Sequence, residues 1–228
     1  MPQMSETLGG RPDSWRVREV GDGNLNLVFT VQGESGSVCV KQALPYVRVA
    51  GDSWPMTLQR AFFEASYYKA VAPYAAGLIP KLYHYDPERY CIVMECLTPH
   101  VILRRGLIAG KRYQQAARDV GEYVARAAFF TSDFAQPFEK KMDGVALFAR
   151  NQELLRITVD LVFCDPYRLS SRNRHTAPQL DPVVSELRRD EALKVAAAHC
   201  ARKFLTETQA LVHGDLHSGS VMVTDTDT

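Results

Sequence analysis

The sequence has no excess of charge of either sign, no long apolar run and no paired cysteines. Its 27 Lys and Arg nearly balance its 26 Asp and Glu, giving a formal net charge of +1, which offers no electrostatic footprint for nucleic acid or an anionic membrane. No apolar segment approaches the roughly 20 residues of a transmembrane helix, and the first residues lack the charged-then-apolar design of a signal peptide. The five cysteines form no CxxC pair, which argues against a disulfide framework or a zinc knuckle. We therefore expect a cytoplasmic protein that acts on a small molecule.

The 228 residues suffice for one large domain or two small lobes, and the sequence pattern changes near Pro99. Before this point, alternating apolar residues predict strands at 25–31 and 37–44, a helix at 57–72 capped by Thr57, and a second hairpin at 81–96. The proline-bracketed segment Pro45–Pro55 is expected to be a loop. Beyond Pro99, helical spacing predicts helices at 113–130, within 138–163 and at 181–210, the last broken near Asp190. The expected fold class is α+β, with a β-rich lobe at 1–98 carrying one helix and a helical lobe at 99–228.

Lys41 lies in the apolar strand VCVKQAL, where an unpaired buried ammonium would cost several kcal/mol. Glu64 lies 23 residues further on, in the middle of the predicted helix. A strand lysine paired with a helix glutamate holds the α- and β-phosphates of ATP in protein kinases. Two plainer interpretations stay open: Lys41 as an edge-strand lysine with a solvated head, and Glu64 as an ordinary surface glutamate.

Two further segments fit nucleotide binding because of their order along the chain. The turn VGDGN carries Gly21 and Gly23, which allow close approach of the backbone to a phosphate, although glycine pairs before strands are mostly plain turns. The stretch CIVMECLTPH resembles a hinge in which the backbone of Glu95 to Leu97 binds the edge of adenine. Taken alone, this second segment is simply the end of a strand.

The segment HGDLHSGS holds the strongest candidate for a catalytic residue, Asp215. A carboxylate in this position would accept or orient the proton of an attacking hydroxyl. Ser220 stands five residues later, where kinases place an asparagine that binds magnesium. Two alternatives remain: His213, Asp215 and His217 as metal ligands on one face of a strand, or a purely structural role in hydrogen bonding to the backbone.

The segment HGDLHSGSVM resembles the catalytic loop of small-molecule kinases with a protein-kinase-like two-lobed fold, such as aminoglycoside and choline kinases. A serine at position 220, together with GDGNLNLVF, VKQALPYVR and GDSWPMTLQRA, is more similar to the 5-methylthioribose kinase family. The segments TSDF and DPY also fit that family, and the resemblance runs from about Val20 to Val223.

The resemblance implies ATP-dependent phosphorylation of the 1-hydroxyl of 5-methylthioribose in methionine salvage, with ATP and Mg²⁺ as cofactors and a homodimer as a possible assembly. Asp215 would meet the sugar hydroxyl, and Trp54 would help to close the site over the nucleotide or the sugar; a packing anchor between the lobes is an equal alternative for Trp54. Glu64 would pair with the nucleotide lysine. The residues implied to contact ATP are Asn24, Lys41, Glu95, Cys96 and Leu97.

The sequence departs from that family in two places. The hinge usually reads Met-Glu-Asp-Leu, and here Cys96 replaces the aspartate. An Asp-x-Glu motif that holds magnesium should follow the strand after the catalytic loop, but Asp225 and Asp227 come too soon after Asp215 to be that motif, and the family's paired arginines are absent. The resemblance therefore implies an amino-terminal portion with an incomplete helical lobe, which we expect to be inactive alone, with Ser220 as a weak metal ligand. The alternatives are a short paralogue that binds a nucleotide or a partner without catalysis, and a kinase for another small alcohol.

Overall fold

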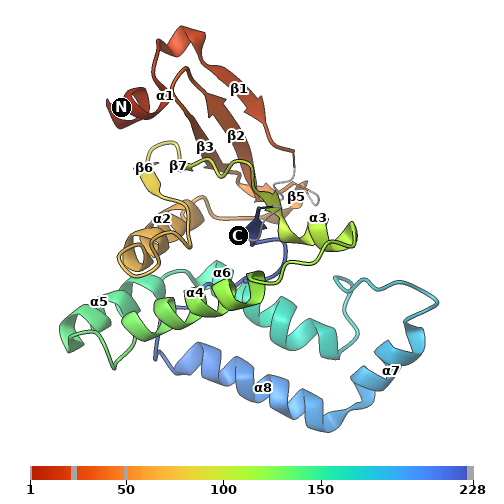
Figure 1. The fold of residues 1–228 in the computed structure, drawn as a ribbon. Coiled ribbons are helices and arrows are strands. Elements are labelled where there is room, and N and C mark those ends of the chain that lie inside the picture. Colours follow the sequence, from red (N-terminus) through yellow and green to blue (C-terminus); the bar gives the residue numbers. More distant parts are fainter. Residues whose placement is uncertain (1, 22–24, 49–50, 225–228) are drawn as a thin grey trace.

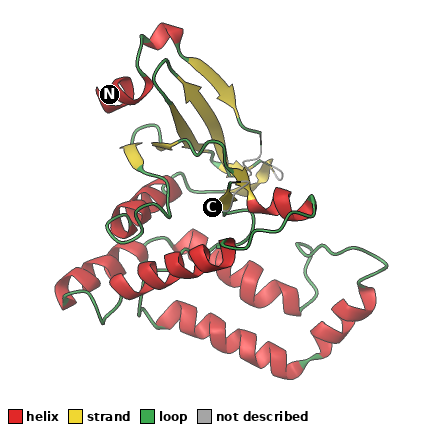
Figure 2. Cartoon of the chain, viewed as in Figure 1, coloured by secondary structure: helices red, strands yellow, loops and turns green. Residues whose placement is uncertain are grey.

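A computed structural model describes residues 2–21, 25–48 and 51–224, and it places a β-sheet above a group of helices (Figures 1 and 2). The strands are β1 (Arg16–Glu19), β2 (Asn26–Gln32), β3 (Ser37–Ala43), β4 (Tyr46–Val47), β5 (Gly51–Pro55), β6 (Leu82–Asp86), β7 (Cys91–Glu95), β8 (Val101–Ile102) and β9 (Met222–Val223). The α-helices are α1 (Pro2–Leu8), α2 (Arg60–Val71), α3 (Leu103–Ile108), α4 (Ala116–Phe130), α5 (Phe138–Phe148), α6 (Gln152–Thr158), α7 (Asp181–Arg189) and α8 (Glu191–Thr206). Short 3-10 turns η1 (Pro12–Ser14) and η3 (Asp165–Tyr167) and a π-helical turn η2 (Val159–Cys164) complete the described elements.

The main sheet has the order β1-β2-β3-β7-β6, and its neighbouring strands are antiparallel. The two hairpins predicted from alternating apolar residues are thereby confirmed. Lys41 pairs with Val28 on one side and with Ile92 on the other, so it lies on a central strand. The interpretation of Lys41 as an edge-strand residue is therefore wrong.

Each face of this sheet is covered by a different helix, because successive side chains of a strand point to opposite faces. On one face, Ala43 of β3 and Ile92 of β7 pack against Ala61 and Ala65 of α2. On the other face, Val38 and Val93 pack with Leu8 of α1, which is fully buried. Helix α1 and strand β1 had no expectation from the sequence, whereas α2 lies within the helix predicted at 57–72.

Helix α4 of the second half packs against the far end of α2. Val71 of α2 and the following Ala75 form a buried cluster with Tyr123 and Ala127 of α4. Helix α8 lies along η2, beneath α4 in the view of Figure 1. The predicted break near Asp190 is confirmed: its Oδ1 accepts a hydrogen bond from the Leu193 N–H at 2.9 Å and caps α8. No helix in the described ranges is long and apolar enough to cross a membrane.

The structure corrects two local expectations. The segment Pro45–Pro55 is a short hairpin of β4 and β5 rather than a loop, closed by a hydrogen bond from the Met56 N–H to the Pro45 carbonyl. Thr57 does not cap α2, which begins at Arg60; the Thr57 N–H instead donates to Glu153 of α6 at 2.7 Å.

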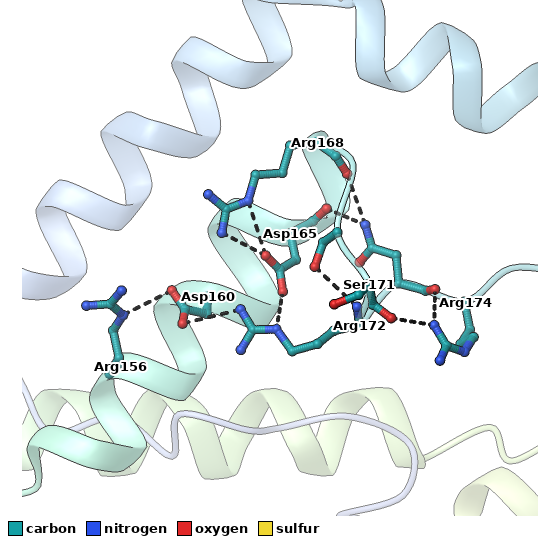
Figure 3. A network of polar contacts seen from close by, with 9 residues as sticks. Arg156, Asp160, Asp165, Arg168, Ser171, Arg172 and Arg174 are labelled. Atoms are coloured by element: carbon teal, nitrogen blue, oxygen red, sulfur yellow. Dashed lines mark hydrogen bonds and ion pairs between the residues drawn. The ribbon is translucent and has the colours of Figure 1, made fainter. Parts of the chain in front are cut away.

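A buried aspartate organises the segment after α6 (Figure 3). Asp165 is 1% exposed. Its Oδ1 accepts a hydrogen bond from Arg168 Nη2 at 2.9 Å, and its Oδ2 forms an ion pair with Arg172 Nε at 2.8 Å. Arg172 also approaches Asp160 at 3.4 Å, and Arg156 pairs with the other oxygen of Asp160 at 3.1 Å. Burial alone would raise the pKa of Asp165, but the hydrogen bonds from the two arginines outweigh it and lower that pKa below its ordinary value.

Replacing the buried carboxylate should destabilise this segment strongly. We expect Asp165→Asn to lower the free energy of unfolding by roughly 2–3 kcal/mol, less than for a fully buried pair because the arginines are partly exposed. Chemical denaturation measures this change. Asp133→Asn is the control, because Asp133 is 64% exposed where it pairs with Lys141, and we expect a loss of no more than about 1 kcal/mol there. Equal losses for the two variants would contradict the assignment of Asp165 as the organising residue.

Candidate active site

The first part of the candidate site is an ion pair between Lys41 of β3 and Glu64 of α2. Both side chains are partly buried, at 24% and 29% exposed. Burial opposes the charge on Lys41, but the attraction of Glu64, supported by Tyr68, outweighs it and raises the pKa of Lys41. The interpretation of Glu64 as an ordinary surface glutamate is therefore wrong, and the lysine is charged and fixed in place.

Cys39 lies two residues before Lys41 and faces the same side of the sheet. Burial raises the pKa of its thiol to about 11. The thiol therefore stays protonated and does not compete with Glu64, or with an anionic ligand, for the lysine charge.

The second part is the loop around Asp215, whose carboxylate is 78% exposed. Gly214 has φ +79°, in the left-handed region that glycine adopts without steric cost, and this bend presents the aspartate side chain to solvent. Ser220 fixes the loop from the other side: its hydroxyl donates to the Asp215 carbonyl at 2.8 Å, and its N–H donates to the His217 carbonyl at 2.8 Å. The loop therefore holds its backbone through its own residues and leaves the carboxylate free to act.

The loop is tied directly to the segment that begins with β8, after β7. Strand β9 pairs with β8, the Leu103 N–H donates to the Val221 carbonyl at 2.9 Å, and the Arg104 N–H donates to the Ser218 carbonyl at 2.9 Å. In Figure 1 this returning strand, at the end marked C, lies between the sheet and the helices. The hydrogen bonds bring residues more than one hundred positions apart into one site.

The ring of His217 shows which of its nitrogens carries the proton. Its Nδ1 lies 2.9 Å from the Gly219 N–H and 2.9 Å from Arg104 Nη2. Both groups can only donate, so Nδ1 accepts and the proton of the neutral ring is on Nε2. That nitrogen lies 3.5 Å from Asp215 Oδ1, so His217 directs a polar hydrogen towards the candidate catalytic carboxylate.

His213 sits at the entrance of the loop against two tyrosines. Its ring meets the ring of Tyr67 at 6.0 Å and that of Tyr123 at 6.4 Å, both edge to face. Its Nδ1 accepts a hydrogen bond from the Asp215 N–H at 3.2 Å. The packing against these rings desolvates the imidazole and lowers the pKa of His213, with Asp215 and Glu64 opposing the shift only in part.

The metal-site alternative finds no support in the described residues, where no group of three or more His, Cys, Asp or Glu could hold a metal ion. His213 and His217 both use Nδ1 to accept hydrogen bonds from within the loop. Ser220 uses its proton on the Asp215 carbonyl, which leaves lone pairs of the hydroxyl oxygen available to a cation. Asp225 and Asp227 lie outside the described residues.

The structure gives different outcomes for the other residues that were predicted to contact the nucleotide or to close the site. The Glu95 N–H donates to the Lys81 carbonyl at 2.8 Å and is not available to a nucleotide. Cys96 and Leu97 continue from β7 into the connection, and the Cys96 sulfur lies 3.7 Å from the Thr98 hydroxyl. Trp54 of β5 packs under Arg172, 5.8 Å from its guanidinium carbon, so it contacts the Asp165 network. Asn24 lies outside the described residues.

Four residues that the sequence analysis did not select belong to this region: Arg104, Tyr67, Tyr123 and Arg172. Tyr67 carried a weak signal, since it stands three residues after Glu64 and therefore on the same side of α2. Arg104 and Arg172 carried none, because Arg104 meets His217 and Arg172 meets Trp54 across more than one hundred residues of sequence.

Residues 16–228 match the phosphotransferase enzyme family (APH). The chain belongs to this family. It is 50% identical to a methylthioribose kinase of Escherichia coli over 96% of this chain and 53% of that protein. It is 45% identical to methylthioribose kinase 1 of Oryza sativa, over 98% of this chain and 52% of the rice protein. The chain thus spans about half the length of the curated relatives it matches.

Membership in this family confirms the expected kinase-like α+β fold class. A solved choline/ethanolamine kinase family protein from Mesorhizobium loti aligns with a TM-score of 0.33 at 15% identity, over 69% of this chain and 53% of that chain. That structural likeness is too slight to carry an inference.

The contact of His213 with the tyrosines predicts an acid-sensitive loop. We expect the imidazole of His213 to titrate below its ordinary value of 6.5, as followed by NMR of labelled histidines. The unfolded chain would take up this proton first as the pH falls, so the free energy of unfolding should decrease below about pH 6.5. Protonation of Nδ1 would also break the hydrogen bond from Asp215. His199→Gln, on an exposed position of α8, is the control and should leave the signal unchanged; a midpoint at or above 6.5 would contradict the prediction.

Proposed function

We propose that this chain forms the nucleotide-binding part and the catalytic loop of a kinase that transfers the γ-phosphoryl group of ATP to the 1-hydroxyl of 5-methylthioribose, in methionine salvage. One observation carries the proposal: Lys41, on a central strand, is paired with Glu64 of α2, while Asp215 is exposed on a fixed loop. The relatives named methylthioribose kinase, at 45–50% identity, support this choice of sugar. The division at residue 98 into two lobes belongs to the same proposal.

Lys41, Asp215 and His217 are each assigned a separate role in the transfer of the phosphoryl group. Lys41, held by Glu64, would neutralise charge on the α- and β-phosphates. The sugar hydroxyl oxygen would attack the γ-phosphorus as the bond to the bridging oxygen of ADP breaks, and the Asp215 carboxylate would accept the hydroxyl proton. His217 Nε2–H, 3.5 Å from Asp215 Oδ1, would orient that carboxylate. These roles require positioning more than covalent catalysis, as is usual for phosphoryl transfer.

Fewer of the described residues are assigned to the nucleotide base and to the metal than to the phosphates and the sugar hydroxyl. The backbone of Cys96 and Leu97 would bind the adenine edge, and backbone contacts tolerate the cysteine side chain. Mg²⁺ would neutralise charge on the phosphates, and Ser220 is the described residue that we assign to it. Trp54, fixed by Arg172, would border the site. We place the protein in the cytoplasm, as a possible homodimer.

Removing the lysine charge should weaken nucleotide binding. We expect Lys41→Met to raise the Kd for ATP by about tenfold or more, since a charge-assisted contact contributes roughly 1.5–3 kcal/mol. Isothermal titration calorimetry on the 228-residue chain measures this change. Lys69→Met is the matched control, because Lys69 lies on an exposed position of the same α2 and should leave the affinity unchanged. An unchanged Kd in Lys41→Met would overturn the assignment.

Asp215 should matter for transfer and not for nucleotide binding. In a chimera that joins this chain to the remaining half of the Escherichia coli relative, Asp215→Asn should lower kcat about 10²–10⁴-fold and leave the Kd for ATP unchanged. Coupled detection of ADP release, with and without 5-methylthioribose, provides the measurement. Asp133→Asn serves as a control on an exposed carboxylate.

We expect the 228 residues alone to show no sugar-dependent ADP release, because Ser220 is the one described residue assigned to magnesium. Activity of the chimera on another alcohol, and none on 5-methylthioribose, would refute the proposed substrate.

A further inference from the structure

Two tyrosines connect the nucleotide half of the candidate site to its catalytic loop. Tyr67 lies on α2, three residues after Glu64 and on the same side of the helix. Its hydroxyl forms a hydrogen bond of 2.5 Å with the hydroxyl of Tyr123 on α4. The helix that fixes Lys41 is therefore also joined to the helix that supports the loop.

Both rings meet the same imidazole. Tyr67 and Tyr123 present themselves edge to face to His213, at interplanar angles of 78° and 82°, an arrangement that aromatic pairs favour. The His213 Nδ1 in turn accepts the Asp215 N–H at 3.2 Å. A continuous series of contacts therefore runs from Glu64 through α2 and the tyrosine pair to the backbone of Asp215.

The hydroxyl pair is well suited to fix one arrangement of these helices. Tyr123 is 8% exposed, and each hydroxyl has the other as its hydrogen-bond partner at 2.5 Å. A shift of α2 relative to α4 would separate the two oxygens, and a buried hydroxyl without a partner is costly. The rings would at the same time move away from His213.

We propose that Tyr67 and Tyr123 are positioning residues, which set the His213–Asp215 loop at a fixed place relative to the Lys41–Glu64 pair. This role rests on the proposed function, since it has meaning only if Asp215 and Lys41 serve one reaction. Neither tyrosine is assigned to the substrate or the nucleotide; both act through His213.

The test uses the 228-residue chain without any ligand. We expect Tyr67→Phe and Tyr123→Phe each to shift the imidazole ¹⁵N signals of His213 and to speed hydrogen exchange at the Asp215 amide by about tenfold, as expected for the weakening of one hydrogen bond. Because the two hydroxyls act as a unit, the double variant should shift the His213 signals and speed exchange at the Asp215 amide no more than either single variant does. If a single variant fails to fold, the double variant gives the result, since it leaves no buried hydroxyl without its partner.

Tyr74→Phe is the matched control. Tyr74 stacks on Phe130 of α4 at 4.7 Å, and its hydroxyl accepts a hydrogen bond from Gln136 at 3.2 Å. Its loss should lower stability without moving the signals of His213 or Asp215. The proposal is overturned if Tyr67→Phe lowers stability yet leaves both signals unchanged, or if Tyr74→Phe moves them equally. These readouts involve neither ATP nor sugar, so their failure is distinct from failure of the kinase assignment.

Discussion

The ion pair between Lys41 and Glu64 is the constraint on which the rest of the site depends. An ammonium group in the middle of a five-stranded sheet is tolerated only with a partner, and the neighbouring strands offer it no carboxylate in their paired positions, Val28 and Ile92. The partner comes from α2, which must therefore lie across this face of the sheet. The small residues Ala61 and Ala65 allow the helix to approach closely enough for Glu64 to reach the lysine.

Once α2 is fixed, it determines how the two halves of the chain meet. The buried Arg60 ties its beginning to β2, by hydrogen bonds to the Leu25 carbonyl and to Asn26. Its far end, at Val71, packs into the cluster shared with α4. The loop around Asp215 is held from the other side by β8 and β9. The position of Asp215 thus depends on contacts made by α2, α4 and β8, which are far apart in the sequence.

The sequence predicts the features that depend on neighbouring residues and misses those that depend on distant ones. Alternation was enough for β2, β3, β6 and β7, and helical spacing was enough for α4 and for the break at Asp190. Lys41 could be selected because charge in an apolar strand is unusual, and Glu64 because it lies in the middle of the helix predicted to follow that strand. The hairpin of β4 and β5 was missed because its prolines favoured a loop. The pairing of β8 with β9 and the contact of His213 with Tyr67 could not be predicted, because they join segments more than one hundred residues apart.

Two aspartates of the second half show how environment assigns different roles to one residue type. Asp165 is 1% exposed and surrounded by guanidinium groups, which hold it ionised and leave it little capacity to accept a proton. Asp215 is 78% exposed and faces a single imidazole N–H at 3.5 Å, so its oxygens remain available to a substrate hydroxyl. The first carboxylate therefore contributes structure and the second can contribute chemistry. The same reasoning separates Glu64, which is committed to Lys41, from any role as a base.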